Sequence, residues 1–305
     1  MSANPVSQAT GFAAQSYSSA TAEGQYQQLL SELYWQSLMT SAATAATASN
    51  VPLSRSIPVD PLVNNQWHLV NSGQQVGNPD FQSIYGTPGE DINLAPVWNT
   101  VYTGAGVLVG VIDSGVQRSH PDLAANIVAA LGFDPLATSG TGNGNPNVIF
   151  PDNAHGTAVA GLIGAVANNG IGGAGVAPGA SLVPIRLIDG SVPLAPGEFT
   201  QAVIESFRYA LQNGVDITNN SWGPPDTRTL AAPTPAELLA IRDTVFFGRN
   251  GLGMIHVWAA GNGGGHNSFR PGFPPDGSFD SSNYDGYANS RYTIAVTGVD
   301  HDGSY

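Results

Sequence analysis

Two short segments place a carboxylate and an imidazole where they could act together in catalysis. Asp113 follows the apolar run 107–112, and His155 opens a segment that reads HGTAVAGLIG. An amide side chain, Asn262, follows a second apolar run at 254–260. In such a set the carboxylate orients the imidazole, the imidazole takes a proton from a nucleophile, and the amide donates to the oxyanion. These residue types therefore predict acyl transfer.

Composition limits the other possibilities. The chain has 305 residues, of which 42% are hydrophobic and only 10% charged, with 38 glycines and 22 prolines. This is typical of a globular, loop-rich protein. The net charge of −13 opposes nucleic-acid binding, and the lack of cysteine excludes a disulfide, a thiol nucleophile and a thiolate zinc site. No standard signal peptide and no membrane-spanning apolar run is visible.

The chain divides into two parts of different composition. Residues 1–50 are rich in Ala, Ser, Thr and Gln, with one amphipathic helical patch between Tyr26 and Leu38. This part is expected to be a low-complexity leader, and a pro-segment or docking helix stays open. Residues 51–305 contain the longer apolar runs and are expected to form the globular domain.

Within that domain, apolar runs alternate with amphipathic segments. We expect strands at 107–112, 181–187, 215–219, 254–260 and 292–299, and helices at 92–98, 198–213 and 235–249. Strands that alternate with helices indicate an α/β fold with a three-layer, doubly wound and mainly parallel sheet. Pro184 restricts its strand to an edge position or a bulge. Asp113 would then lie at the carboxyl end of a strand, where open α/β sheets bind ligands.

Six short motifs follow one another along the chain: 111–115 (VIDSG), 120–123 (HPDL), 155–161 (HGTAVAG), 220–224 (NSWGP), 258–264 (WAAGNGG) and 280–290 (DSSNYDGYANS). In type and order they resemble the motifs of the subtilisin-like serine proteases (subtilases), and in particular of their kexin and furin branch, and the resemblance extends from about Asp60 onward. The resemblance implies a serine endopeptidase with a subtilisin-like catalytic domain.

The resemblance also implies individual roles. It assigns Asp113 and His155 to the charge relay and Asn262 to the oxyanion hole. The substrate-binding residues that it implies are Ser221 and Trp222 along the peptide backbone, Asp226 and Asp285 for an arginine or lysine at P1, and Asp152 for a basic P2 residue. The partner is therefore a peptide or protein substrate.

Structural calcium is the cofactor that the resemblance implies. Its first site would take carboxylates from Asp60 and Asp122 and further oxygens, mainly backbone carbonyls, from Val166, Asn169, Ile171 and Gly173. Asp280 would bind a second ion, although the acids at 280 and 285 could also belong to a solvated loop. Calcium prefers six to eight oxygen ligands, and a glycine-rich loop lets carbonyls converge.

The chain departs from the family pattern in three places. Ser114 stands where furin-like enzymes usually carry a second aspartate that faces P2, and Ile204 stands where some carry an acid for P4. No Gly-Thr-Ser nucleophile motif occurs, and Ser304 comes too early to serve. We therefore expect the catalytic domain to be incomplete at its C-terminus and the reading frame to continue beyond Tyr305 to the serine.

Other interpretations compete with the protease. A subtilase-like scaffold that binds peptides without catalysis would also fit a chain without a nucleophile. The segment 170–175 satisfies G-x-G-x-x-G, but a helix precedes it and a strand follows, the reverse of a dinucleotide site. The remaining histidines, His68, His120, His256, His266 and His301, are expected to be ordinary polar or surface residues. Family resemblance implies an extracellular or cell-surface location.

Overall fold

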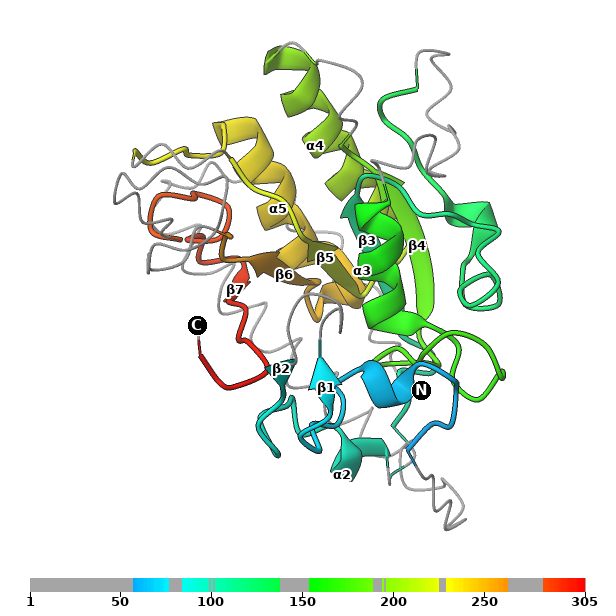
Figure 1. Ribbon diagram of the computed structural model, residues 1–305. Coiled ribbons are helices and arrows are strands. Elements are labelled where there is room, and N and C mark those ends of the chain that lie inside the picture. Colours follow the sequence, from blue (N-terminus) through cyan, green and yellow to red (C-terminus); the bar gives the residue numbers. More distant parts are fainter. Residues whose placement is uncertain are drawn as a thin grey trace, which may run out of the picture. The chain divides into compact units, whose positions relative to one another are not determined.

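The computed structural model of the chain (Figure 1) describes residues 57–76, 84–98, 100, 102–137, 154–188, 194, 196–224, 229–262 and 282–304. The chain divides into two units, Met1–Pro52 and Leu53–Tyr305, and every described residue belongs to the second unit. The helix expected between Tyr26 and Leu38 lies outside the described residues, so the leader stays a prediction.

The predicted alternation of strands and helices is present. An irregular region comes first, with η3 (Val63–Asn65), β1 (Gln75–Val76), β2 (Ile84–Tyr85) and α2 (Ala95–Trp98). The alternating elements follow as β3 (Leu108–Asp113), η4 (Ala129–Leu131), α3 (His155–Gly164), β4 (Ser181–Arg186), α4 (Pro196–Gln212), β5 (Ile217–Asn220), α5 (Pro235–Phe247), η6 (Gly248–Gly251), β6 (Ile255–Ala259) and β7 (Ile294–Val296). The largest difference concerns β7, which is shorter than the predicted strand at 292–299.

The main sheet has five parallel strands in the order β4-β3-β5-β6-β7. The chain therefore leaves β3 for β4 on one side and returns to β5 on the other side. This makes β3 the strand at which the topology switches direction, the position where open α/β sheets bind their ligands. Asp113, the last residue of β3, lies at that switch point.

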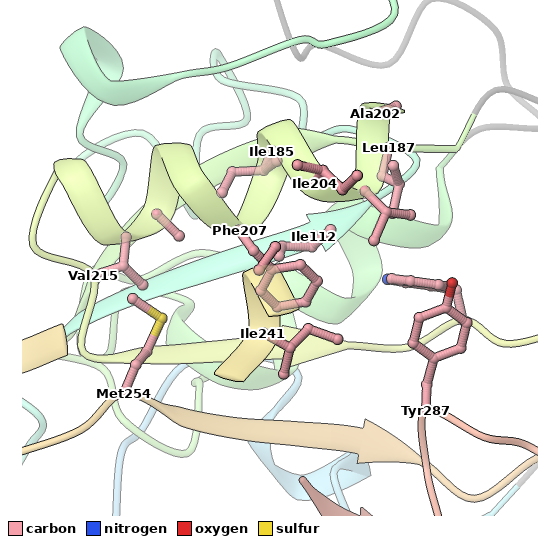
Figure 2. Close-up of a cluster of buried hydrophobic side chains, with 14 of the residues drawn as sticks. Ile112, Ile185, Leu187, Ala202, Ile204, Phe207, Val215, Ile241, Met254 and Tyr287 are labelled. Atoms are coloured by element: carbon pink, nitrogen blue, oxygen red, sulfur yellow. The ribbon is translucent and has the colours of Figure 1, made fainter. Parts of the chain in front are cut away.

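Helices cover both faces of the sheet, as a three-layer fold requires (Figure 1). Because successive side chains of a strand point to opposite faces, Val111 packs with Ala160 of α3, whereas the neighbouring Ile112 packs with the other two helices. Figure 2 shows the core on the α4 and α5 side of the sheet, where Ile112 lies beside Phe207 of α4 and Ile241 of α5.

The position of Pro184 confirms the edge prediction. Its strand, β4, is the outermost strand of the five. On the outer side of β4, Leu182 and Ile185 form isolated parallel bridges with Ile127 and Phe133. The carbonyl of Pro184 accepts a hydrogen bond from the Phe133 N–H at 3.0 Å. The missing N–H of proline therefore costs no ladder bond with β3.

A third, smaller core joins the start of the domain to the loop that follows α3. Leu69 and Trp98 pack there with Ala174, and the Trp98 indole N–H donates to the carbonyl oxygen of Val176 at 3.3 Å. This packing fixes the N-terminal segment against the loop in which calcium ligands are predicted. No helix in the described residues is long and apolar enough to cross a membrane.

Candidate active site

The end of β3 and the start of α3 bring the two predicted relay residues together. Nδ1 of His155 lies 2.8 Å from Oδ1 of Asp113. The Asp113 side chain is fully buried, whereas 59% of the His155 side chain is exposed. The pair therefore has a shielded acid and an imidazole that solvent or a substrate can reach.

Two residues that the sequence analysis did not assign to the relay hold this pair. The Ser114 N–H donates to Oδ1 of Asp113 at 2.7 Å, and Oγ of Ser114 accepts the N–H of Gly156 at 3.0 Å. A Cβ atom on Gly156 would lie 2.4 Å from the carbonyl oxygen of Gly115, so only glycine fits there. Ser114 is buried and caps the first turn of α3, where unpaired N–H groups need an acceptor. In the sequence, the Ser-Gly pair that follows Asp113 and the glycine that follows His155 were the features that could have indicated this support.

The hydrogen bond fixes which nitrogen of His155 carries the proton. An ionised carboxylate only accepts, so Nδ1 donates to Asp113 and Nε2 keeps its lone pair. A neutral imidazole in this tautomer can take a proton at Nε2 from a hydroxyl group. Asp113 would then stabilise the imidazolium that forms. The second oxygen of Asp113, Oδ2, is buried with no hydrogen-bond partner among the described residues.

The other predicted residues of the reaction centre follow neighbouring strands of the same sheet edge. Ser221 comes directly after β5, and Asn262 follows β6 and is exposed. Trp222 is 8% exposed, and its carbonyl oxygen accepts the indole N–H of Trp258 at 2.7 Å. The backbone at Trp222 is therefore tied to the core beside β5. The carboxyl ends of β3, β5 and β6 therefore carry, in that order, Asp113, the segment predicted to contact the substrate, and an exposed amide.

Of the acids predicted at the substrate pockets, only Asp285 lies within the described residues. Its Oδ1 atom accepts the N–H groups of Tyr287 at 2.8 Å and of Ala288 at 3.2 Å. A Cβ atom on Gly223 would come within 2.6 Å of Oδ2 of Asp285. The carboxylate thus lies against the segment that follows β5. Asp152, Asp226 and Asp280 lie outside the described residues.

The loop predicted to bind calcium wraps around both predicted carboxylates. Asp60, 3% exposed, accepts the N–H groups of Asn168 at 2.5 Å and of Gly170 at 2.9 Å. Asp122, 6% exposed, accepts the Nδ2 of Asn169 at 2.7 Å. Among the described residues, no ion pair involves either acid. Two buried carboxylates with no cationic side chain beside them carry negative charge that a bound cation would neutralise.

The remaining predicted ligands of this site lie along the same turn. The N–H of Gly173 donates to Asp122 at 3.1 Å, and Oδ1 of Asn169 accepts the N–H of Ile171 at 2.9 Å. The backbone of Val166 donates to the Asp122 carbonyl at 2.9 Å. The described residues contain no cluster of three or more His, Cys, Asp or Glu side chains suited to a metal. An ion here would need carbonyl oxygens as well as the two acids.

Gly172 is a requirement of this loop that the sequence analysis did not single out. Its φ is +57°, and a Cβ atom there would lie 2.0 Å from Oδ2 of Asp122. Any side chain would displace the carboxylate. The run of glycines was the available signal, but it did not indicate which glycine faces the acid.

His256 does not fit the expectation of an ordinary polar or surface residue. It is 1% exposed, with Nδ1 2.7 Å from Oγ1 of Thr218 and Nε2 2.6 Å from Oγ1 of Thr244. The Thr244 hydroxyl donates to the carbonyl of Ile241, so it accepts from Nε2–H, and Thr218 donates to Nδ1. Burial lowers the pKa of His256 to about 4. The ring is therefore a neutral core group, placed by the partners on β5 and α5.

Comparisons with known proteins agree with this geometry. A profile described as the subtilase family matches residues 104–304. Neuroendocrine convertase 2 of Homo sapiens is 37% identical over 249 residues, which are 80% of this chain and 34% of that protein. PC3-like endoprotease variant B of Hydra vulgaris is 37% identical over 246 residues, 79% of this chain and 30% of that protein. The serine protease of Aeromonas sobria has a similar structure, with a TM-score of 0.64, 30% identity, and coverage of 84% of this chain and 43% of that chain. The chain spans about a third of the length of these curated relatives.

Proposed function

The chain belongs to the subtilase family, and we propose that the protein is a serine endopeptidase of the kexin-like branch, stabilised by calcium and selective for a basic P1 residue. The contact that carries the proposal is the 2.8 Å approach of Nδ1 of His155 to the buried Oδ1 of Asp113. The relatives named a convertase, an endoprotease and a serine protease support hydrolysis of peptide bonds.

In this proposal His155 is the general base. Its Nε2 takes the proton of a serine hydroxyl as the oxygen attacks the peptide carbonyl, and the same atom later gives the proton to the leaving amine. Asp113 holds the ring and stabilises its charged form. No Gly-Thr-Ser motif that would supply this serine occurs in the 305 residues.

Asn262 is proposed as a side-chain donor to the oxyanion. In subtilisin, loss of an asparagine donor to the oxyanion lowers kcat by about 10²–10³. The described segment at Ser221 and Trp222 is proposed to run beside the substrate backbone. The buried indole of Trp258 holds this segment through the Trp222 carbonyl.

The P1 preference rests on Asp285, with Asp226 and Asp152 as further predicted acids. The carboxylate of Asp285 lies against Gly223 in the segment that follows β5. A negative group at the base of a pocket favours an arginine or lysine side chain. Ile204 is 6% exposed and packs in the core, so it offers no polar group for P4 (Figure 2).

A structural calcium ion would be held by Asp60 and Asp122 with oxygens of Val166, Asn169, Ile171 and Gly173, and a second ion by Asp280. The fit rests on the two buried acids, which lack a cationic partner among the described residues. When bound, the ion would neutralise their charge and cross-link the N-terminal segment to the loop after α3. Family membership favours an extracellular or cell-surface location.

A fluorophosphonate probe tests the activity on the full-length product. Covalent labelling at a serine beyond residue 305, lost in His155→Ala, supports the endopeptidase. Absence of labelling in a folded product supports the alternative, a catalytically inactive peptide-binding scaffold with the subtilase fold. Arginyl and leucyl peptide substrates then test specificity, and equal cleavage rates would contradict the basic P1 preference.

A further inference from the structure

Glu237 is a buried acid near the proposed P1 pocket to which the catalytic proposal gives no role. It is 2% exposed and lies in the first turn of α5, where it forms a capping box with Thr234. Its Oε2 atom accepts the Thr234 N–H at 2.6 Å. None of the ion pairs among the described residues includes Glu237. Its charge is therefore stabilised by hydrogen bonds and by the helix N-terminus.

The described neighbour that connects this acid to the pocket is Tyr287. Burial raises the pKa of the Tyr287 phenol first, and the charge of Glu237, a side-chain hydrogen bond with Glu237 and the charge of Asp285 raise it further. The phenol is thus a protonated donor next to a carboxylate. Its ring stacks on Trp258 with centroids 5.0 Å apart and planes 6° apart, and lies 5.2 Å from the ring of Trp222 (Figure 2 shows Tyr287 at this end of the core).

The turn that begins at Asp285 is held by Tyr287 and by the segment that leads into α5. The Tyr287 N–H donates to Oδ1 of Asp285, and the Gly286 N–H donates to the carbonyl of Ala231 at 3.0 Å. Ala231 in turn donates to the carbonyl of Tyr284 at 2.9 Å. Both sides of Asp285 are therefore tied to the segment that leads into α5. Oδ1 is used inside the turn, and Oδ2 is the oxygen that lies against Gly223.

We propose that Glu237 and Tyr287 are positioning residues for substrate specificity: together they hold the Asp285 carboxylate against Gly223, where a cationic P1 side chain binds. This inference rests on the proposed basic P1 preference. The Glu237 carboxylate holds the Tyr287 phenol in place, and the Tyr287 ring, stacked on Trp258, holds the turn that begins at Asp285. That turn sets the position of Oδ2 of Asp285. Without the Glu237 acceptor, the phenol leaves its place to find another partner and the turn shifts, because a buried polar group needs a hydrogen bond.

The test measures cation recognition without requiring turnover. Benzamidine carries a planar amidinium, and benzamide is its neutral counterpart, so the ratio of their dissociation constants measures recognition of the charge. Isothermal titration of both compounds compares the wild-type chain with Asp285→Asn, Glu237→Leu, Glu237→Gln and Tyr287→Phe. Asp243→Leu is the matched control, because Asp243 is an acid of the same helix with a 37% exposed side chain.

The wild-type chain is expected to prefer benzamidine by about tenfold or more, and Asp285→Asn to lose this preference. Glu237→Leu and Tyr287→Phe should each lower the ratio about threefold or more, because the phenol loses its acceptor or the ring loses its hydroxyl. Glu237→Gln keeps an acceptor oxygen and should restore most of the ratio. Asp243→Leu should match the wild type.

Three outcomes would overturn the inference. Wild-type ratios in both Glu237→Leu and Tyr287→Phe, with loss in Asp285→Asn, would refute the positioning role and leave the P1 proposal intact. If Glu237→Gln lowers the ratio as much as Glu237→Leu does, the negative charge of Glu237 affects benzamidine binding directly, and its hydrogen bond to Tyr287 does not position Asp285. No preference in the wild-type chain would refute the P1 proposal and this inference with it. If Glu237→Leu does not fold, Tyr287→Phe decides the positioning role.

Discussion

Gly156 lies so close to Asp113 that a Cβ atom on Gly156 would be 3.0 Å from both Cβ and Oδ1 of Asp113. The first turn of α3 and the last residue of β3 are therefore in direct contact, and the position of His155 depends on this contact. A methyl group between them would push the helix away from the acid that orients its histidine.

Gly156→Ala should therefore damage catalysis more than stability. Overpacking of this kind costs about 1–3 kcal/mol of folding free energy, and a displacement of about 1 Å in a catalytic group costs about 10²-fold in rate. Peptide hydrolysis by the full-length protein and thermal melting measure the two effects. Gly161→Ala is the matched control, because a Cβ atom there meets no atom within 4 Å. Equal activity in the two variants would contradict the contact.

Asp113→Asn should lower kcat by roughly 10³–10⁴-fold and change KM little, because an amide cannot both hold the Nδ1–H tautomer and stabilise an imidazolium. Steady-state kinetics on one arginyl peptide measures the effect. The melting temperature should be checked in parallel. Activity within about tenfold of the wild type would remove Asp113 from the relay.

Calcium removal should lower the melting temperature. A ligand present at about 100 times its Kd adds about 2.7 kcal/mol, which corresponds to a shift of roughly 5–10 °C for a domain of this size. Differential scanning calorimetry with calcium and with chelator measures it. The Asp60→Asn/Asp122→Asn variant should melt at a lower temperature in calcium and respond to chelator less than the wild type does, because only the proposed second ion at Asp280 remains, whereas Asp243→Asn should respond like the wild type. A chelator shift as large in the double variant as in the wild type would place the ion elsewhere.

Lowering the pH should reduce the free energy of unfolding, because the buried His256 must become protonated. Its pKa is lowered from 6.5 to about 4, so the unfolded chain binds a proton at a pH where the folded chain does not. The stability is fully present above pH 6.5 and is lost as the pH falls towards 4, by about 3 kcal/mol in total. Urea unfolding at several pH values measures the slope.

A His256→Gln variant serves as the comparison for that slope. It should be less stable at pH 7, because glutamine cannot reproduce both threonine contacts, and it should lack the His256 part of the pH dependence between 6.5 and 4. An identical pH dependence in the two proteins would assign the slope to other groups.

Much of the fold followed from local pattern. The apolar run before Asp113 predicted a buried strand, and the proline in β4 predicted an edge, because both depend on residues that are adjacent in sequence. The glycine-rich run after α3 indicated a tight loop, but not which glycine faces Asp122. The apolar run 254–260 around His256 did not reveal what would hold a buried imidazole there, since its threonine partners come from other elements.

The order of strands and helices, the polar residues at their ends and the family motifs could be predicted from the sequence, because these are properties of neighbouring residues. Three features emerged from the folded chain: β3 is the switch strand, Ser114 and Gly156 hold the His155–Asp113 pair, and Asp60 contacts a loop 108 residues later in the sequence. Hydrogen bonds and burial of this kind depend on strand order and loop path, which periodicity does not encode.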